Sequence, residues 1–151
     1  MRLSKRGEYG LRAMMLLAEF YEPLESPPPT RIKDISEVEN IPIKYLEQIL
    51  LALKNAGLLN SKKGIHGGYY LAKHPSEIYL GQIVRILDGP LAPIRCVSQM
   101  AYEPCGCRDE ETCGLRMVMG DVRNAIAEIL DNTSLEDMCN RVSKVRQKLN
   151  G

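Results

Sequence analysis

The spacing of apolar residues near the N-terminus predicts an amphipathic helix over residues 4–21. The positions that define its buried face recur at helical intervals: Leu11, Met14, Met15 and Ala18. Ser4 stands where an N-cap residue is favoured. Three consecutive prolines within the segment PLESPPPT then end the helix, because proline lacks the amide hydrogen that a helix interior needs.

The following segment predicts two more helices. Thr30 is expected to cap a short helix that ends near Val38, and a turn at 40–42 leads into a helix over residues 42–55. The apolar stripe of this third helix is Leu46, Ile49, Leu50 and Leu53. Gly57 fits the position that ends a helix in the left-handed conformation.

Two short strands, 58–61 and 69–72, are expected on either side of the glycine-rich basic turn KKGIHGG. Helix, short helix, tight turn, helix and β-ribbon, in this order, predict a winged helix-turn-helix. In such a module the second helix of the pair enters the major groove of DNA. The fold class is therefore mainly α with a small β-wing.

The C-terminal half predicts a linking helix over 80–87 and a long helix that begins near residue 114. The apolar residues of the long helix alternate at spacings of three and four, which is the seam of a helix that packs along a partner: Leu115, Val118, Val122, Ala125 and Ile129. A second copy of the chain is the simplest partner, so a homodimer is expected. Ser134 opens a last helix.

This pattern divides the chain into three parts. Residues 1–75 form the DNA-binding module, 76–113 form a linking helix and a cysteine-rich loop, and 114–151 form the dimerisation and C-terminal helices. The predicted recognition helix presents polar side chains near its N-terminal end: Lys44, Tyr45, Glu47 and Gln48. Gln48 suits the edge of adenine, Glu47 suits cytosine, and Lys44 suits guanine or phosphate.

Further contacts to DNA are expected from the wing and from the N-terminus. The wing residues are Lys62, Lys63 and His66, and the phosphate contacts of the N-terminal segment are Arg2 and Lys5. The alternative interpretation is a solvated polar helix face and an ordinary hairpin turn with exposed lysines. The order of the elements favours the DNA-binding interpretation.

Charge and composition give only weak evidence about the partner and the location of the protein. The net charge is +1, but residues 1–73 carry +3 and the remainder −2, which weakly favours an anionic partner for the N-terminal half. No apolar run approaches the roughly 20 residues that a bilayer requires. The charged N-terminus lacks the apolar segment and the small-residue cleavage site of a signal peptide. A cytoplasmic location is expected, and there structural disulfides are rare.

The cysteines are the candidate metal-binding or redox-active residues of the chain. Four of the five lie in one turn-rich stretch, RCVSQMAYEPCGCRDEETCG, as Cys96, Cys105, Cys107 and Cys113. In a cytosolic protein such a cluster favours a metal or redox site. The spacing lacks the paired C-x2-C of structural zinc sites and does not match ferredoxins, although thiolates are the usual ligands of iron–sulfur clusters. Inert buried thiols are the alternative, and the isolated Cys139 is expected to be a small core residue.

The segments MRLSKRGEYGLRAMMLLA, IPIKYLEQILLALKNAGLL and KKGIHGGYYLA, with the cysteine loop, resemble the IscR/NsrR/CymR group of bacterial winged-helix transcription regulators. The resemblance covers the chain from Met1 to about Val142. It implies a homodimeric regulator, not an enzyme, that binds a pseudo-palindromic operator in double-stranded DNA. It also implies a 2Fe–2S or 4Fe–4S iron–sulfur cluster held by three loop cysteines and a variable fourth ligand.

Carried over from the group, Cys96 matches the first ligand and Cys113 the third. Cys107 has the usual five-residue gap before the third ligand, whereas Cys105 is an additional thiol. Arg116 stands where some members have a histidine ligand. Other members use an acid near the start of the first helix, donated across the dimer, and Glu8 occupies that position. The fourth ligand is therefore expected to be Glu8 or Cys105.

The function predicted is a regulator that senses cluster status, iron, or redox and nitric oxide stress. Two alternatives stay open. One is a cluster-free regulator that acts through thiol chemistry or a protein partner, as some members of the group do. The other is an iron–sulfur electron-transfer protein, for which a recognition helix and wing would have no purpose.

Overall fold

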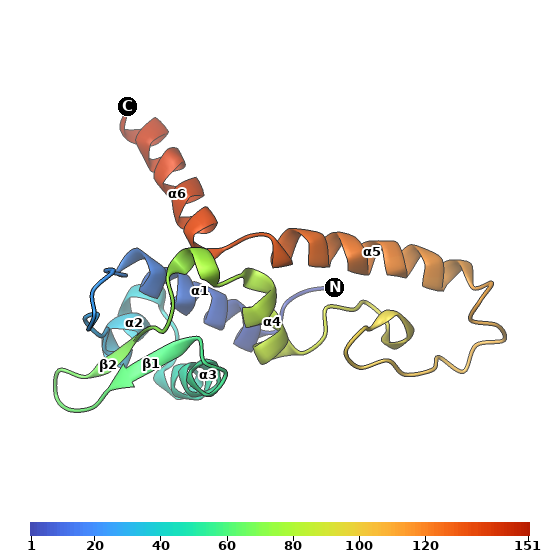
Figure 1. The fold of residues 1–151 in the computed structure, drawn as a ribbon, viewed down its shortest axis with the longest axis horizontal. Helices are drawn as coiled ribbons and strands as arrows, with labels where there is room; N and C mark the ends of the chain where they lie inside the picture. The colour runs from blue at the N-terminus through green and yellow to red at the C-terminus, as the bar shows by residue number, and fades with distance from the viewer.

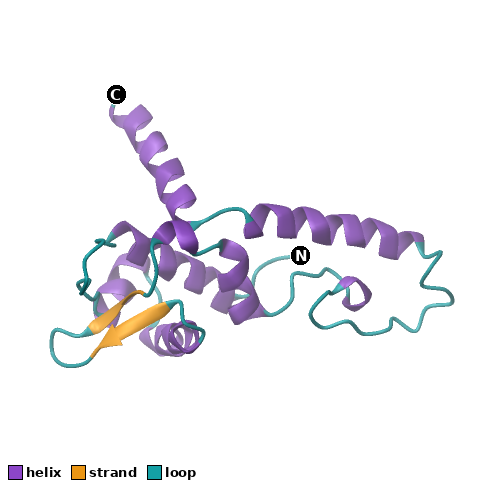
Figure 2. Cartoon of the chain, in the orientation of Figure 1, coloured by secondary structure: helices purple, strands orange, loops and turns teal.

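The computed structural model describes all residues 1–151 and contains six α-helices, two short 3₁₀ helices and one two-stranded sheet (Figure 1; Figure 2). The elements in chain order are α1 (Lys5–Glu19), α2 (Ile32–Glu39), α3 (Ile43–Asn55), β1 (Leu59–Lys62), β2 (Gly68–Leu71), η1 (Pro75–Glu77), α4 (Leu80–Asp88), η2 (Arg95–Val97), α5 (Gly114–Asp131) and α6 (Leu135–Asn150). This order confirms the predicted fold class, a winged helix-turn-helix followed by a long helix.

The start of α1 follows the prediction, and the start of α2 does not. The hydroxyl of Ser4 accepts a hydrogen bond from the amide of Gly7 at 3.0 Å, as expected of an N-cap. Thr30, in contrast, caps no helix. Its N–H donates to the carbonyl of Tyr69 at 2.8 Å and its carbonyl accepts from the Tyr69 N–H at 2.9 Å. These bonds keep Thr30 paired with β2. Arg31 is therefore the N-cap residue, and α2 begins at Ile32.

The turn of the helix-turn-helix is formed by Asn40, which adopts a left-handed conformation with φ 53°. Asparagine tolerates this region better than most residues because its short polar side chain can bond locally. The carbonyl of Ile41 then accepts a hydrogen bond from Ser36 Oγ at 2.6 Å, and Ile41 N donates back to the Ser36 carbonyl at 3.1 Å. The turn is thus closed from both sides, and Pro42 leads directly into α3.

One core joins the helix-turn-helix to α4 and to the start of α6. Its largest fully buried side chains come from several helices and include Met14, Leu46, Leu50, Ile83 and Leu135. Burial of one such side chain stabilises a fold by about 1.5–3 kcal/mol. Ile83 and Leu135 therefore hold α4 and α6 firmly to the winged-helix body.

Helix α5 projects from this body (Figure 1). A small second cluster, Val84, Leu91 and Ala127, packs α5 on α4. Asp131, at the end of α5, accepts two hydrogen bonds from the Arg85 guanidinium, at 2.5 and 2.9 Å. This pairing lowers the pKa of Asp131 and raises the pKa of Arg85. None of the helices is both long and apolar enough to cross a membrane.

Candidate DNA interface and cysteine loop

The outward face of α3 carries all four side chains that the sequence predicted for base reading. Lys44, Glu47 and Gln48 are exposed, and the Tyr45 side chain lies beside Tyr9 of α1 with ring centroids 6.2 Å apart. The opposite face of α3 is the fully buried apolar stripe. The helix is therefore fixed by its core side and presents polar groups on the other, as a helix that enters a groove must do.

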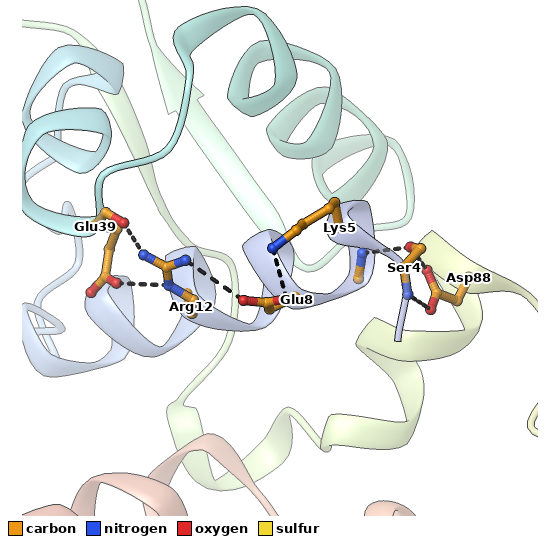
Figure 3. Close-up of polar contacts among 7 residues, drawn as sticks. Ser4, Lys5, Glu8, Arg12, Glu39 and Asp88 are labelled. Carbon is orange, nitrogen blue, oxygen red and sulfur yellow. Dashed lines mark hydrogen bonds and ion pairs between the residues drawn. The ribbon is translucent and has the colours of Figure 1, made fainter. Parts of the chain in front are cut away.

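A chain of ion pairs along α1 braces the turn before α3 (Figure 3). Arg12 Nε lies 3.3 Å from Glu39 Oε2, and Arg12 Nη2 donates to the Glu39 backbone carbonyl. Glu39 is the last residue of α2, so this contact holds the end of α2 against α1. Glu8 continues the chain, 3.9 Å from Arg12 Nη1 and 3.6 Å from Lys5 Nζ. No local sequence signal marks the role of Arg12, because its partner Glu39 is 27 residues away in the chain.

The N-terminal segment that carries Arg2 and Lys5 is anchored at Ser4. The Ser4 amide donates to Asp88 Oδ2 at 3.0 Å, and its hydroxyl donates to the same carboxylate (Figure 3). Asp88 ends α4, just before the cysteine-rich segment. Arg2 and Lys5 are both exposed on this anchored segment.

The wing is the hairpin of β1 and β2, and its three predicted DNA contacts fall into two groups. Lys63 and His66 are exposed at its tip. Lys62 instead donates to Ser26 Oγ at 2.7 Å and to the Pro27 carbonyl at 2.8 Å. Lys62 therefore fastens the proline-rich turn to the wing. Nothing in the local sequence signals this bond.

All four loop cysteines line one pocket of about 310 Å³ near the first turn of α5, together with Ile94, Arg95 and Leu115. Cys96 is buried in η2, and Cys113 is the N-cap residue of α5. Cys105 and Cys107 form a disulfide. The structure thus brings the predicted thiols to one pocket but does not assemble three ligating groups around a common point.

The chemistry of these donors fits an iron–sulfur cluster. Thiolates are the usual ligands of such clusters. Four thiols line the pocket, so three of them can serve as ligands even if the fourth does not. Ligation by Cys107 requires that the disulfide with Cys105 be reduced. Glu8 is not among the residues that line the pocket within one chain, and its carboxylate is engaged with Lys5 and Arg12.

Polar side chains order the loop around these thiols. Arg116 of α5 donates to the Cys96 carbonyl and to the Glu110 carbonyl, both at 3.4 Å. The hydroxyl of Tyr102 donates to Glu110 Oε2 at 2.5 Å, and this hydrogen bond lowers the pKa of Glu110 and raises the pKa of Tyr102. The residue at the position of the group's histidine ligand therefore braces the loop through backbone carbonyls.

Comparison with known proteins identifies the family. Residues 3–141 match the family model Rrf2, described as an iron-dependent transcriptional regulator. The chain belongs to the Rrf2 family. A putative HTH-type regulator of Rhodobacter capsulatus, rrf2-like, is 37% identical, covering 90% of this chain and 91% of its own length. CymR of Bacillus subtilis is 36% identical over 91% of this chain and 89% of its own length. IscR of Pectobacterium carotovorum is 32% identical over 93% and 80%.

Two solved structures share the Rrf2 fold with this chain. CymR, the global cysteine regulator of B. subtilis, superposes with a TM-score of 0.76 at 34% identity, covering 93% of this chain and 98% of its own. IscR of T. potens superposes with a TM-score of 0.75 at 30% identity, covering 96% and 90%. The resemblance expected from the sequence is confirmed. This Rrf2 protein is a DNA-binding transcriptional regulator and not an enzyme.

Proposed function

We propose that this Rrf2 protein is a homodimeric cytoplasmic regulator whose affinity for a pseudo-palindromic operator is set by an iron–sulfur cluster in the cysteine loop. Residues 1–75 would bind DNA, 76–113 would sense, and 114–151 would dimerise. The observation that carries the proposal is the pocket shared by four thiols where the loop meets α5. The loop connects α4, which is packed into the winged-helix core, with the projecting α5.

The homodimer is supported by the seam of α5. Leu115, Val118 and Ile129 are between 57% and 63% exposed in the single chain, although all three are large and apolar. A contiguous apolar row of this kind marks a protein contact. Val118→Asp is expected to yield a monomer in sedimentation analysis. Val38→Asp, at an equally exposed valine on α2, should leave the dimer intact.

DNA binding in this proposal uses the outward face of α3 for bases and the wing and N-terminus for phosphates. Gln48 and Glu47 would contact base edges, and Lys44 would contact guanine or phosphate. Lys63, His66, Arg2 and Lys5 would add phosphate contacts. Two recognition helices related by a dimer axis require half-sites that are spaced by the distance between them.

In the sensing step, Cys96, Cys107 and Cys113 would hold the cluster, with Cys105 or Glu8 as the fourth ligand. A bound cluster supplies a redox-active, iron-dependent link between its ligands. Cys96 belongs to η2 and Cys113 begins α5, so ligation of both fixes the loop against the first turn of α5. Arg116 already holds part of this arrangement through the Cys96 carbonyl. A state with the loop fixed would differ from a free loop in how α5 orients the two DNA-binding modules.

A second candidate is a cluster-free regulator that responds through thiol chemistry. It is favoured by the disulfide between Cys105 and Cys107 and by the similarity to CymR, the global cysteine regulator. In this case reduction and oxidation of the pair, with no iron present, would change operator affinity.

Anaerobic reconstitution with iron and sulfide separates the two candidates. Ultraviolet–visible and Mössbauer spectra are recorded on the wild type and on Cys105→Ala, Cys107→Ala and Glu8→Ala, and operator affinity is measured for each. Loss of the cluster spectrum in Cys107→Ala, and in one of the other two variants, supports the cluster and names its fourth ligand. A colourless, iron-free protein whose DNA affinity still follows the state of the Cys105–Cys107 pair supports the thiol mechanism.

A further inference from the structure

Two aliphatic side chains on α3 point away from the core: Ile43, the first residue of the helix, which is 45% exposed, and Leu51, about two turns further along. Leu51 is 51% exposed, whereas the other leucines of α3 are fully buried: Leu46, Leu50 and Leu53. About half of the Leu51 side chain stays accessible in the single chain, so it offers apolar surface that a partner outside the chain can bury.

Helical geometry places Leu51 in the middle of the outward stripe of α3. At about 100° per residue, Lys44, Gln48 and Asn55 lie within about 60° of Leu51 around the helix axis. The buried leucines lie on the other side of the axis, centred about 135° away from Leu51. Lys44, Gln48 and Asn55 are all exposed. Leu51 is thus the apolar member of an otherwise polar stripe.

The core leaves this side chain half exposed, and the proposed dimer seam on α5 lies on another part of the chain. Helix α4 contacts both α3 and α5, and in Figure 1 these two helices lie on opposite sides of it. A single leucine among charged and amide side chains also lacks the apolar surroundings of a protein–protein interface core. A major groove offers a matching group, because the 5-methyl of thymine is the apolar feature of base-pair edges there.

We propose that Leu51 is a specificity-determining residue that contacts the 5-methyl group of a thymine in each operator half-site. The inference rests on the proposed role of α3 as the recognition helix. Leu51 is one helical turn beyond Gln48, about 4.5 Å further along the axis. The thymine therefore lies one or two base pairs from the pair that Gln48 contacts.

The test uses the full-length protein and the operator that it selects from random duplexes. Each thymine of a half-site is replaced in turn by deoxyuridine, which keeps base pairing and lacks only the methyl group. Binding is measured by fluorescence anisotropy. One position is expected to weaken wild-type binding about fourfold per half-site, or about 0.8 kcal/mol, the value of one buried methylene. Replacement in both half-sites should weaken binding about 16-fold.

Leu51→Ala is expected to bind thymine and deoxyuridine duplexes equally at that position. Because Leu51 is exposed, this variant should keep the melting temperature of the wild type. Val38→Ala, which removes an exposed aliphatic side chain from α2, should keep the wild-type discrimination. The proposal is overturned if no thymine within reach of Leu51 is selected, if no position discriminates deoxyuridine, or if discrimination persists in Leu51→Ala.

A separate variant tests the underlying role of α3. Gln48→Ala should lose sequence preference at the neighbouring base pair. If Gln48→Ala retains the full preference, the assignment of α3 as the reading helix fails. If Gln48→Ala loses it while deoxyuridine has no effect, the role of α3 stands and only the role of Leu51 fails.

Discussion

The ion pair that joins α4 to α5 leaves no room for a side chain at Gly81. A β-carbon at Gly81 would overlap the Asp131 carboxylate and lie 2.9 Å from Arg85 Nη1. In Gly81→Ala the carboxylate must therefore swing away and give up both hydrogen bonds to Arg85. This ion pair is partly exposed, with 22% of the Arg85 and 41% of the Asp131 side chain accessible, so its loss costs about 1 kcal/mol, the upper end for exposed pairs.

The same substitution has a compensating benefit. Alanine in a helix is favoured over glycine by about 0.5–1 kcal/mol. Gly81→Ala should therefore leave the free energy of unfolding nearly unchanged in the wild type. In an Asp131→Ala background the overlap and the ion pair are already gone, so the same change should stabilise by about 0.5–1 kcal/mol. The effect of Gly81→Ala on the free energy of unfolding should therefore differ by about 1 kcal/mol between the two backgrounds, and this difference is the contribution of the Arg85–Asp131 ion pair.

Urea unfolding followed by circular dichroism, at one fixed protein concentration, measures all four proteins of this cycle. A fixed concentration is needed because association shifts apparent stability. Gly120→Ala is the control, since the nearest atom to its added β-carbon is Val97 Cγ1 at 3.9 Å, an ordinary contact. It should behave alike in both backgrounds. If Gly81→Ala has the same effect in both backgrounds to within about 0.3 kcal/mol, the reasoning is refuted.

Three further outcomes are expected. Because the folded-state pKa of Asp131 is lowered, the stability difference between wild type and Asp131→Asn should be present above about pH 4, the unfolded value, and should disappear in urea titrations as pH falls below it. Burial raises the pKa of the Cys139 thiol, so at neutral pH it should alkylate more slowly than the same cysteine in urea, as followed by mass spectrometry. Lys63→Ala should reduce the salt dependence of DNA binding by about one charge, whereas Lys62→Ala should chiefly increase proteolysis of the proline-rich turn, because Lys62 is bonded to it.

The winged helix could be predicted because its signals are local. The Ser4 cap, the Gly57 stop with φ 84° and the apolar stripe of α3 each depend on residues within a few positions of one another. The order of the six α-helices and two strands followed from such signals, whereas η1 and η2 were not predicted. The exposure of the α5 seam is likewise consistent with its heptad spacing.

What the sequence could not predict depends on contacts between distant residues. Thr30 was expected to cap α2, but its backbone pairs with Tyr69. The hydrogen bonds from Lys62 to the proline-rich turn, up to 36 residues earlier, likewise have no local signal. Neither the Asp88 anchor of the N-terminus nor the role of Arg12 has a signature in nearby residues. The four cysteines share a pocket, yet their spacing alone does not say which of them pair.

In the proposed sensing mechanism, the long connection between α4 and α5 allows sensitivity to change separately from the choice of operator. Ordering each residue of a loop costs about 1–2 kcal/mol of conformational entropy, so whatever binds at the thiols must first overcome the freedom of those residues in 89–113 that no core contact or hydrogen bond already fixes. Changes in the length or stiffness of this connection alter that threshold while α3 and the wing stay as they are. In that mechanism, mutations in the connection would change the level of signal at which the protein responds, while the operators that it binds would stay the same.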